Sequence, residues 1–406
     1  MPRRPFAGAV GDLESLLVAC REGRLYDVER WVAGGRPLQL AGPRDYPSRR
    51  RVTPLRVALD RADHALALLL LCNGYDPDRE PYEPLEIALR ARRPDLVELL
   101  LGWGADPHRV RLSTLFGTYD SALFERFSGL GVDLTARQGL AKALGYHSSN
   151  KPLYGFAKSR AARDPSVQAA LDSALAEHAY HGRERGALLC LWAGADPHAP
   201  ARSLPFRFYY DEDDPDDNLY PDDDSDDEGE EAHTALHAAC LGGHGALVER
   251  FKPDPDRDDI QSLLLAAASA EVVDVLARFE LARDVTAVVK RRVEMAGWEW
   301  DGRDEIGALQ RHFELGAHWA DAPKDVVGDI RRTVLRHSDH AFGRLVLVLV
   351  GEGACSPAVL RELGRTPAFQ RRLRSVGLLP SSGDRGWRRR HGAGLAETVM
   401  RAFPDR

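Results

Sequence analysis

Two neighbouring stretches decide the fold class: TPLRVALDRADHALALLLLCNGYDPD at 53–78 and YEPLEIALRARRPDLVELLLGWGADPH at 82–108. They align without a gap, and each has a leucine nineteen residues before a glycine, a spacing that recurs elsewhere in the chain. The four pairs are Leu16 and Gly35, Leu55 and Gly74, Leu85 and Gly104, and Leu175 and Gly194. Self-similarity at a fixed period of about 20–50 residues is typical of repeat architectures. We therefore expect an array of repeats in place of separate globular domains.

Local signals within each repeat predict two helices joined by a tight turn. Thr53 and Pro54 suit a helix start, because a threonine hydroxyl caps the first turn and proline loses only an N–H that lacks a helical partner. Gly23, Gly182 and Gly243 share one position, seven residues after the repeat leucine, where we expect the chain to turn. The closing glycine of each repeat suits a left-handed residue at the end of the second helix.

This pattern resembles the ankyrin repeat, a helix, turn, helix unit of about 33 residues that opens with a T-P-L-H-x-A motif and is followed by a hairpin loop, or finger. The stretch TALHAACLGGH at 234–244 follows that motif. The resemblance is strong over 53–108, 173–198 and 234–251, and weaker over 12–36. It implies an all-α, ankyrin-like helical repeat solenoid of about nine units.

The expected organisation has an irregular C-terminal half. Residues 112–134 form a shortened repeat, 135–172 admit two registers, and 332–354 read as a further helix pair. The predicted segments are an N-terminal tail at 1–11, repeats at 12–198 that diverge at 112–172, an acidic insertion at 199–233, increasingly divergent repeats at 234–360, and an Arg-rich capping region at 361–406.

Composition excludes several protein classes. The 406 residues are 44% hydrophobic and 29% charged, and no apolar run approaches the length of about 20 residues that spans a bilayer. Asp12 and Glu14 interrupt the first apolar stretch too early for a secretory signal. Five scattered cysteines without a CxxC motif suit a reducing compartment. We therefore expect a cytoplasmic protein without disulfides, monomeric when free, that does not enter a membrane.

An acidic run interrupts the repeats. Residues 211–231 hold fourteen Asp or Glu and no Lys or Arg, whereas the whole chain has a formal charge of −7. Forty positions separate Gly194 from Thr234, where a regular finger needs about twelve. The run therefore lies in a finger between two repeats, and such density of like charge predicts disorder in the free protein. Before it, alternation from Leu204 to Tyr210 is consistent with a short strand.

Three interpretations of the insertion stay open: a solvated loop, an arm that captures a partner through charge and aromatic residues, or a segment that docks on the basic end of the chain itself. A calcium loop is a poor match. Asp224, Asp226, Glu228 and Gly229 fit the first positions of an EF-hand loop, but Ala235 stands where a bidentate Glu is required. No metal site is expected.

Basic residues gather in two other places. The finger before Thr53 carries RDYPSRRR at 44–51, and residues 361–406 hold eleven Arg against four acidic residues. A helix capped by Thr366 should place Phe369, Leu373 and Val376 on its inward face. Its arginines, Arg371, Arg372 and Arg374, should face outward. Arginine excess without a recognition motif is not sufficient to predict nucleic acid as a partner.

Histidines and cysteines of the repeats favour structural roles. His237 and His244 occupy positions where the ankyrin motif has histidines that brace its turns. Cys20 and Cys240 share one repeat position and suit small buried hydrophobes. The chain contains no HExxH, P-loop, GxSxG or dinucleotide motif. We expect no catalytic residue, no cofactor and no enzyme activity.

Two functions compete. The resemblance implies a non-catalytic interaction module, or scaffold, that binds another protein of unknown identity, possible partners including basic ones, through its concave face and fingers. The alternative is an inhibitor or immunity-type protein whose acidic finger imitates nucleic acid to block a basic site. An enzyme with chemistry hidden in 255–360 is a third class that no motif supports. The candidate partner-binding residues are Tyr75, Asp76, Trp103, His108, His198, Arg49, Arg50, Arg51, Tyr209, Tyr210, Tyr220, Asp222, Asp223 and Asp224.

Overall fold

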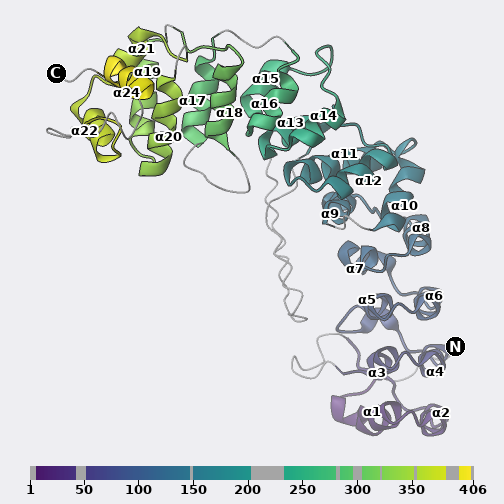
Figure 1. Cartoon of the computed structure of the whole chain (residues 1–406). Coiled ribbons are helices and arrows are strands. Elements are labelled where there is room, and N and C mark those ends of the chain that lie inside the picture. Colours follow the sequence, from purple (N-terminus) through teal and green to yellow (C-terminus); the bar gives the residue numbers. More distant parts are fainter. Residues whose placement is uncertain are drawn as a thin grey trace. The chain divides into compact units, whose positions relative to one another are not determined.

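Helices make up most of the residues that the computed structural model describes, in agreement with the predicted all-α class. The described residues are 6–42, 52–146, 150–202, 233–279, 284–295, 304–320, 322–351, 354–380 and 393–403. Within them the strands are β1 (Pro200–Ala201) and β2 (His233–Thr234), two residues each. The chain divides into an N-terminal part, Met1–Ala170, and a C-terminal part, Leu171–Arg406 (Figure 1).

The N-terminal part is a series of helical hairpins. Its elements are η1 (Val10–Leu13), α1 (Glu14–Arg21), α2 (Leu25–Ala33), α3 (Pro54–Asp60), α4 (His64–Cys72), η3 (Pro77–Arg79), α5 (Pro84–Arg90), α6 (Pro94–Gly102), η4 (Pro107–Arg109), α7 (Leu112–Phe116), α8 (Ser121–Gly129), η5 (Ala136–Gln138), α9 (Gly139–Tyr146) and α10 (Lys151–Ala161). The first helices of successive hairpins, α1, α3, α5, α7 and α9, pack on one another in sequence order, and among the second helices α4 contacts α6 and α8 contacts α10 (Figure 1). Helix α11 (Pro165–Tyr180) spans the boundary between the two parts.

The predicted caps and turns are present. The Thr53 hydroxyl accepts a hydrogen bond from the Arg56 amide at 3.0 Å, and the turn after α1 contains Gly23 with a φ of 69°. The same turn position in the next two hairpins holds Ala62 and Arg92, with φ of 51° and 52°. The hairpin geometry therefore imposes a left-handed residue even where the sequence does not supply glycine. The closing glycines are left-handed as predicted; Gly35, Gly74, Gly104 and Gly194 have φ of 67°, 90°, 91° and 107°.

The C-terminal part continues with helical hairpins. Its helices are α12 (Glu184–Ala193), α13 (Ala235–Gly242), α14 (Gly245–Phe251), α15 (Ile260–Ala266), α16 (Ala270–Leu276), α17 (Thr286–Met295), α18 (Glu305–Glu314), α19 (Lys324–Val334), α20 (Asp339–Val350), α21 (Pro357–Leu363), α22 (Pro367–Ser375) and α24 (Ala393–Ala402). Helices α13, α15, α17, α19 and α21 contact one another in order, as do α14, α16, α18 and α20. Two layers of helices result.

Glycines allow the hairpin α11–α12 to approach the hairpin α13–α14. A Cβ on Gly242 would lie 2.2 Å from the carbonyl oxygen of Tyr180, and a Cβ on Gly182 would lie 2.4 Å from the ring of His244. The His244 Nε2 atom lies 3.1 Å from the same Tyr180 oxygen. The expected local hydrogen bond is therefore replaced by a contact with the preceding hairpin, 64 residues earlier in the chain.

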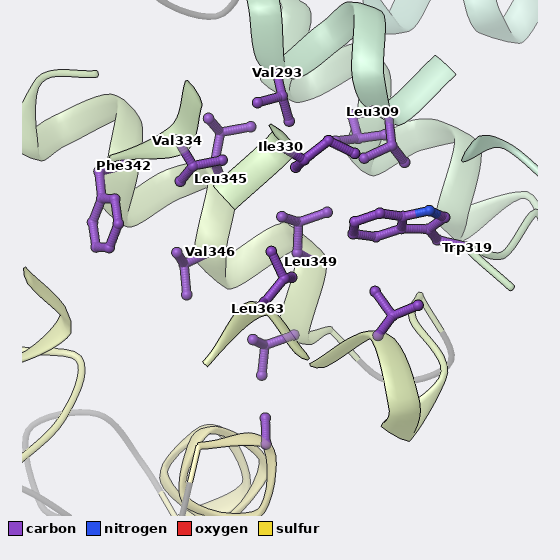
Figure 2. Close-up of a cluster of buried hydrophobic side chains, with 14 of the residues drawn as sticks. Val293, Leu309, Trp319, Ile330, Val334, Phe342, Leu345, Val346, Leu349 and Leu363 are labelled. Carbon is purple, nitrogen blue, oxygen red and sulfur yellow. The ribbon is translucent and has the colours of Figure 1, made fainter. Parts of the chain in front are cut away.

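A continuous apolar core holds the last hairpins together. It runs from α17 to α24 and includes Trp319 and Phe342, both fully buried (Figure 2). Phe369 is a further fully buried member. Trp319 lies in an extended segment, where its amide donates to the Ala354 carbonyl at 2.6 Å. Of the three residues predicted on the inward face of α22, Phe369 and Leu373 are inaccessible to solvent and Val376 is partly buried against the same core. Thr366 stands at the predicted cap position, but its side chain makes no capping hydrogen bond.

Four predictions about the ends of the array need correction. The N-terminal tail joins the packed structure from Ala7, which is buried and pairs with Leu40. The helix pair expected at 332–354 is α19 and α20, which begins eight residues earlier at Lys324. The capping region begins within α21, because Val359 belongs to the core. Arg372 does not simply face outward, since its guanidinium donates to the Leu335 and His337 carbonyls at 3.0 and 2.6 Å, beyond the end of α19.

Among the described residues, no helix combines the length and the apolar character needed to cross a membrane.

Candidate functional site

The fingers after α4 and α6 share one internal design. Asp76 caps the short helix η3 by accepting from the Asp78 amide at 3.1 Å, and Asp106 caps η4 by accepting from the His108 amide at 2.9 Å. In both fingers a proline follows the aspartate, which suits the first position of a short helix. The Asp-Pro pairs seen in the sequence therefore build the fingers.

Successive fingers of the N-terminal part are tied to each other. The Asp106 amide donates to the Asp78 carboxylate at 3.1 Å, and Arg109 donates to the Asp78 carbonyl at 3.1 Å. One finger earlier, the Asp76 amide donates to the Gln39 side chain at 2.9 Å. Arg79 in turn donates to the Ala41 carbonyl at 2.6 Å. Each finger is thus held by the one before it, which fixes its position without help from a ligand.

A buried carboxyl group lies beneath the first of these fingers. Glu80 accepts hydrogen bonds from the hydroxyls of Tyr75 and Thr53, the latter at 2.6 Å, and the Tyr82 hydroxyl lies 2.8 Å from that of Thr53. Burial raises the pKa of Glu80, although the hydroxyl donors around it act in the opposite direction. The network satisfies a polar group that would otherwise be costly to bury.

The predicted surface position of Tyr75 is wrong. Its side chain is only 3% exposed and its hydroxyl is bound to Glu80. The residues in the same register, Ala105 and Ala195, are also buried. Small apolar residues at this position were the sequence signal that the site faces inward.

The other candidates of the N-terminal part lie nearer to the surface. Trp103, at the end of α6, is 39% exposed, and His108, at the middle of η4, is exposed. Asp76 is partly exposed, yet its carboxylate accepts from Arg79 at 2.9 Å in addition to capping η3. Tyr119, which sequence reasoning did not select, is exposed and lies beneath the Arg92 guanidinium at 5.8 Å from its ring centre.

Charges beside the second finger are paired and partly dehydrated. Arg111 binds both carboxylate oxygens of Glu86 at 2.8 Å. Burial alone would raise the pKa of Glu86, but the bonds from Arg111 outweigh it and the pKa is lowered. Burial raises the pKa of neighbouring Glu83 to about 7, despite an ion pair with Arg109 at 3.1 Å. Of the two carboxyl groups, Glu83 is therefore the weaker acid.

The predicted exposure of His198 is also wrong. Its Nδ1 atom lies 2.9 Å from each carboxylate oxygen of Asp258, and its side chain is only 9% exposed. Beside this contact, Arg257 donates to Asp196 at 2.8 Å. The following finger, at 252–259, supplies both partners. His108, at the homologous position in the N-terminal part, is exposed.

The remaining candidates lie outside the described residues. They are Arg49, Arg50, Arg51, Tyr209, Tyr210, Tyr220, Asp222, Asp223 and Asp224. The strand expected at 204–210, the acidic run and the calcium-like stretch at 224–231 lie there too. What the structure does describe is the base of the insertion: β1 and β2 pair antiparallel, with Pro200 opposite Thr234 and Ala201 opposite His233.

The cysteines and histidines singled out in the sequence can now be placed. Cys20 and Cys240 are fully buried, as predicted, and burial raises the pKa of Cys20 to about 12, with Asp63 adding to the effect. No group of three or more His, Cys, Asp or Glu is arranged to hold a metal ion in the part of the chain that the structure describes. His237 lies against His233, a contact that sequence reasoning missed although the HxxxH spacing at 233–237 was visible.

No protein-family model matches this chain, and no curated protein matches it either.

Proposed function

We propose that the chain is an ankyrin-type repeat protein that binds another protein without catalysis, through its fingers and the adjoining first helices. One observation carries the proposal: successive fingers are built alike and bound to one another by side chains placed one repeat apart. A repeat that only filled a core would not need its loops held in this way. Loops on a rigid scaffold are the usual place for recognition residues.

Bracing of the fingers favours binding because it reduces the conformational entropy lost on association. Arg79 makes an ion pair with Asp76, and Arg109 makes ion pairs with Asp78 and Glu83; each also donates to a carbonyl of the preceding finger. Their guanidinium groups are consequently used for positioning. Asp76 and Asp106 have the same role, so we now regard Asp76 as a positioning residue and not as a contact.

Exposed aromatic and imidazole side chains supply the contacts. Trp103, His108 and Tyr119 project from the rigid N-terminal hairpins, and aromatic residues dominate the binding energy of many protein interfaces. Tyr75 and His198 leave the set, because both are buried in contacts within the chain. Tyr119 lies in the turn between α7 and α8, at the end of the hairpin away from the fingers. The contact surface proposed for the fingers of the N-terminal part is therefore Trp103 and His108.

The acidic insertion supports a second function, an inhibitor that occupies a basic site on another protein. The supporting observation is the paired base at Pro200–Ala201 and His233–Thr234, from which a run of fourteen acidic residues departs. Attraction between exposed charges weakens over a distance of about 8–10 Å at ordinary salt. Binding through this run should therefore be steeply salt-dependent.

Affinity capture with the full chain, followed by mass spectrometry, tests both functions. Bait variants are Trp103→Ala with His108→Ala, a deletion of 211–231, and Trp192→Ala as the matched control on an exposed tryptophan of the C-terminal part. The first function predicts a partner that the double variant loses, that the control keeps and that survives high salt. The second predicts a partner that the deletion loses and that salt removes. A partner retained by both variants would contradict both functions.

A further inference from the structure

Two histidine rings face each other where the chain leaves the insertion and enters α13. His233 belongs to β2 and His237 to the first turn of α13. Their Nδ1 atoms lie 2.9 Å apart, and the ring centroids lie 4.4 Å apart. Two imidazole lone pairs at this distance would repel, so one Nδ1 carries a proton that it donates to the other.

Backbone contacts hold both rings in place independently of each other. His233 is fixed by strand pairing with Ala201. His237 is fixed by the helix start, where its amide donates to the Thr234 hydroxyl at 3.1 Å. Both rings are partly buried. The pair is therefore presented by the fold and does not depend on two flexible side chains meeting by chance.

Two charged side chains of the following helices interact electrostatically with His237. Arg291, from α17, is exposed, and Asp259 caps α15 through the Gln261 amide at 3.0 Å. A neutral imidazole has a nitrogen lone pair available for a metal ion.

We propose that His233 and His237 form a two-nitrogen binding site for a divalent metal ion of the zinc and copper class. Imidazole nitrogen suits these ions, whereas calcium takes oxygen ligands. Zinc–nitrogen bonds of about 2.0–2.1 Å in tetrahedral geometry place two ligand nitrogens roughly 3.3 Å apart. The rings need to separate by only a few tenths of an ångström from their present 2.9 Å.

Binding requires one proton to move within the pair. The ring that carries its proton on Nδ1 transfers it through solvent to its own Nε2, so that both Nδ1 lone pairs face the ion and no proton is released. Water completes the coordination, since no third His, Cys, Asp or Glu of the described residues joins the pair in a metal-binding arrangement. The site is consequently open on one side, and weaker than a closed structural zinc site. This inference does not depend on the proposed binding function.

Zinc titration of the full chain by calorimetry at pH 7.5, with millimolar calcium present, tests the site. Two variants change the pair, His233→Gln and His237→Gln, and His108→Gln is the matched control on an exposed histidine. A deletion of 211–231 is included because the acidic run also attracts cations. We expect one zinc ion per chain in the wild type, the control and the deletion. Binding should be about tenfold weaker, or lost, in each pair variant.

Two results would overturn the proposal: binding that disappears with the acidic run and persists in both glutamine variants, or no binding by the wild type. Far-UV circular dichroism verifies that each variant is folded. If His237→Gln does not fold, the proposal is tested with His233→Gln and with the copper(II) electron spin resonance spectrum of the wild type. Hyperfine coupling to two imidazole nitrogens supports the site, and a spectrum with oxygen ligands alone refutes it.

Discussion

Replacement of His312 by leucine should stabilise the C-terminal part. His312 lies on α18 and is only 1% exposed, and neither ring nitrogen has a hydrogen-bond partner among the described residues. A buried polar group without a partner costs about 1–3 kcal/mol. Leucine removes both polar atoms while keeping an apolar side chain of similar size. We expect the free energy of unfolding to rise by about 1–3 kcal/mol at pH 7.

The gain should increase in acid. Burial lowers the pKa of His312 to about 4, and the nearby Arg292 guanidinium adds to the effect. Because the ring takes up a proton more readily in the unfolded chain, stability is lost as pH falls below about 6.5 toward 4. At pH 5 this linkage amounts to about 2 kcal/mol, which leucine at this position abolishes. His237, whose pKa is also lowered to about 4, leaves a smaller acid dependence in the variant.

Urea unfolding at pH 8, 7, 6 and 5, followed by circular dichroism and tryptophan fluorescence, measures both effects. His108→Leu is the matched control, because that histidine is exposed and its replacement should leave the pH dependence unchanged. The reasoning would be refuted if the leucine variant were less stable than the wild type at pH 7 and lost as much unfolding free energy as the wild type when the pH is lowered to 5. It would mean that the ring nitrogens of His312 are bonded in the folded protein.

Three further predictions follow from packing and charge. Leu236→Ala should cost about 2–5 kcal/mol of unfolding free energy, whereas His108→Ala should change it by less than about 0.5 kcal/mol; equal effects in urea would show that the repeat register is wrong. Gly242→Ala should lower the unfolding free energy by about 1–3 kcal/mol, because its Cβ would meet a backbone carbonyl at 2.2 Å. Gly155→Ala in α10 has open space around it and should raise the unfolding free energy by roughly 0.5–1 kcal/mol. Thermal melts that give both variants the same stability would contradict the packing. The pKa of Glu83 rises from 4.5 to about 7 on folding, so its own contribution to stability is full below about pH 4.5 and is lost as pH rises through 7, opposite in sign to that of His312; Glu83→Gln should remove this loss in urea titrations at pH 5–8, and an unchanged pH dependence would exclude Glu83 as its source.

Much of the helical framework could be predicted from local patterns. The spacing from Leu55 to Gly74 predicted a helix pair that the structure shows as α3 and α4, with Thr53 as cap and Gly74 left-handed. These features depend on residues within a few positions of one another, which is why sequence patterns report them well. Prediction weakened toward the C-terminus, where α19 began eight residues before the expected pair, because no cap or closing glycine marked its start.

The candidate surface was predicted less well. His108 and His198 follow the same Asp-Pro pair, yet one is exposed and the other is buried against Asp258, sixty residues along the chain. Tyr75 lies inward, as Ala105 and Ala195 do in the same register, and its hydroxyl donates to the buried Glu80. The exposure of a finger residue therefore depends on whether side chains of the neighbouring finger contact it, as Asp258 contacts His198.

The sequence by itself determined the helical class, the two-helix repeat with its glycine closures, and the place of the acidic run between two repeats. Caps, turns and apolar periodicity are short-range properties that each repeat encodes separately. Only the tertiary structure decided that Asp76 and Arg79 position a finger, that His233 meets His237, and that His312 is buried without a partner. Those outcomes depend on contacts between side chains of different segments, whose pairing and burial follow from how successive hairpins pack.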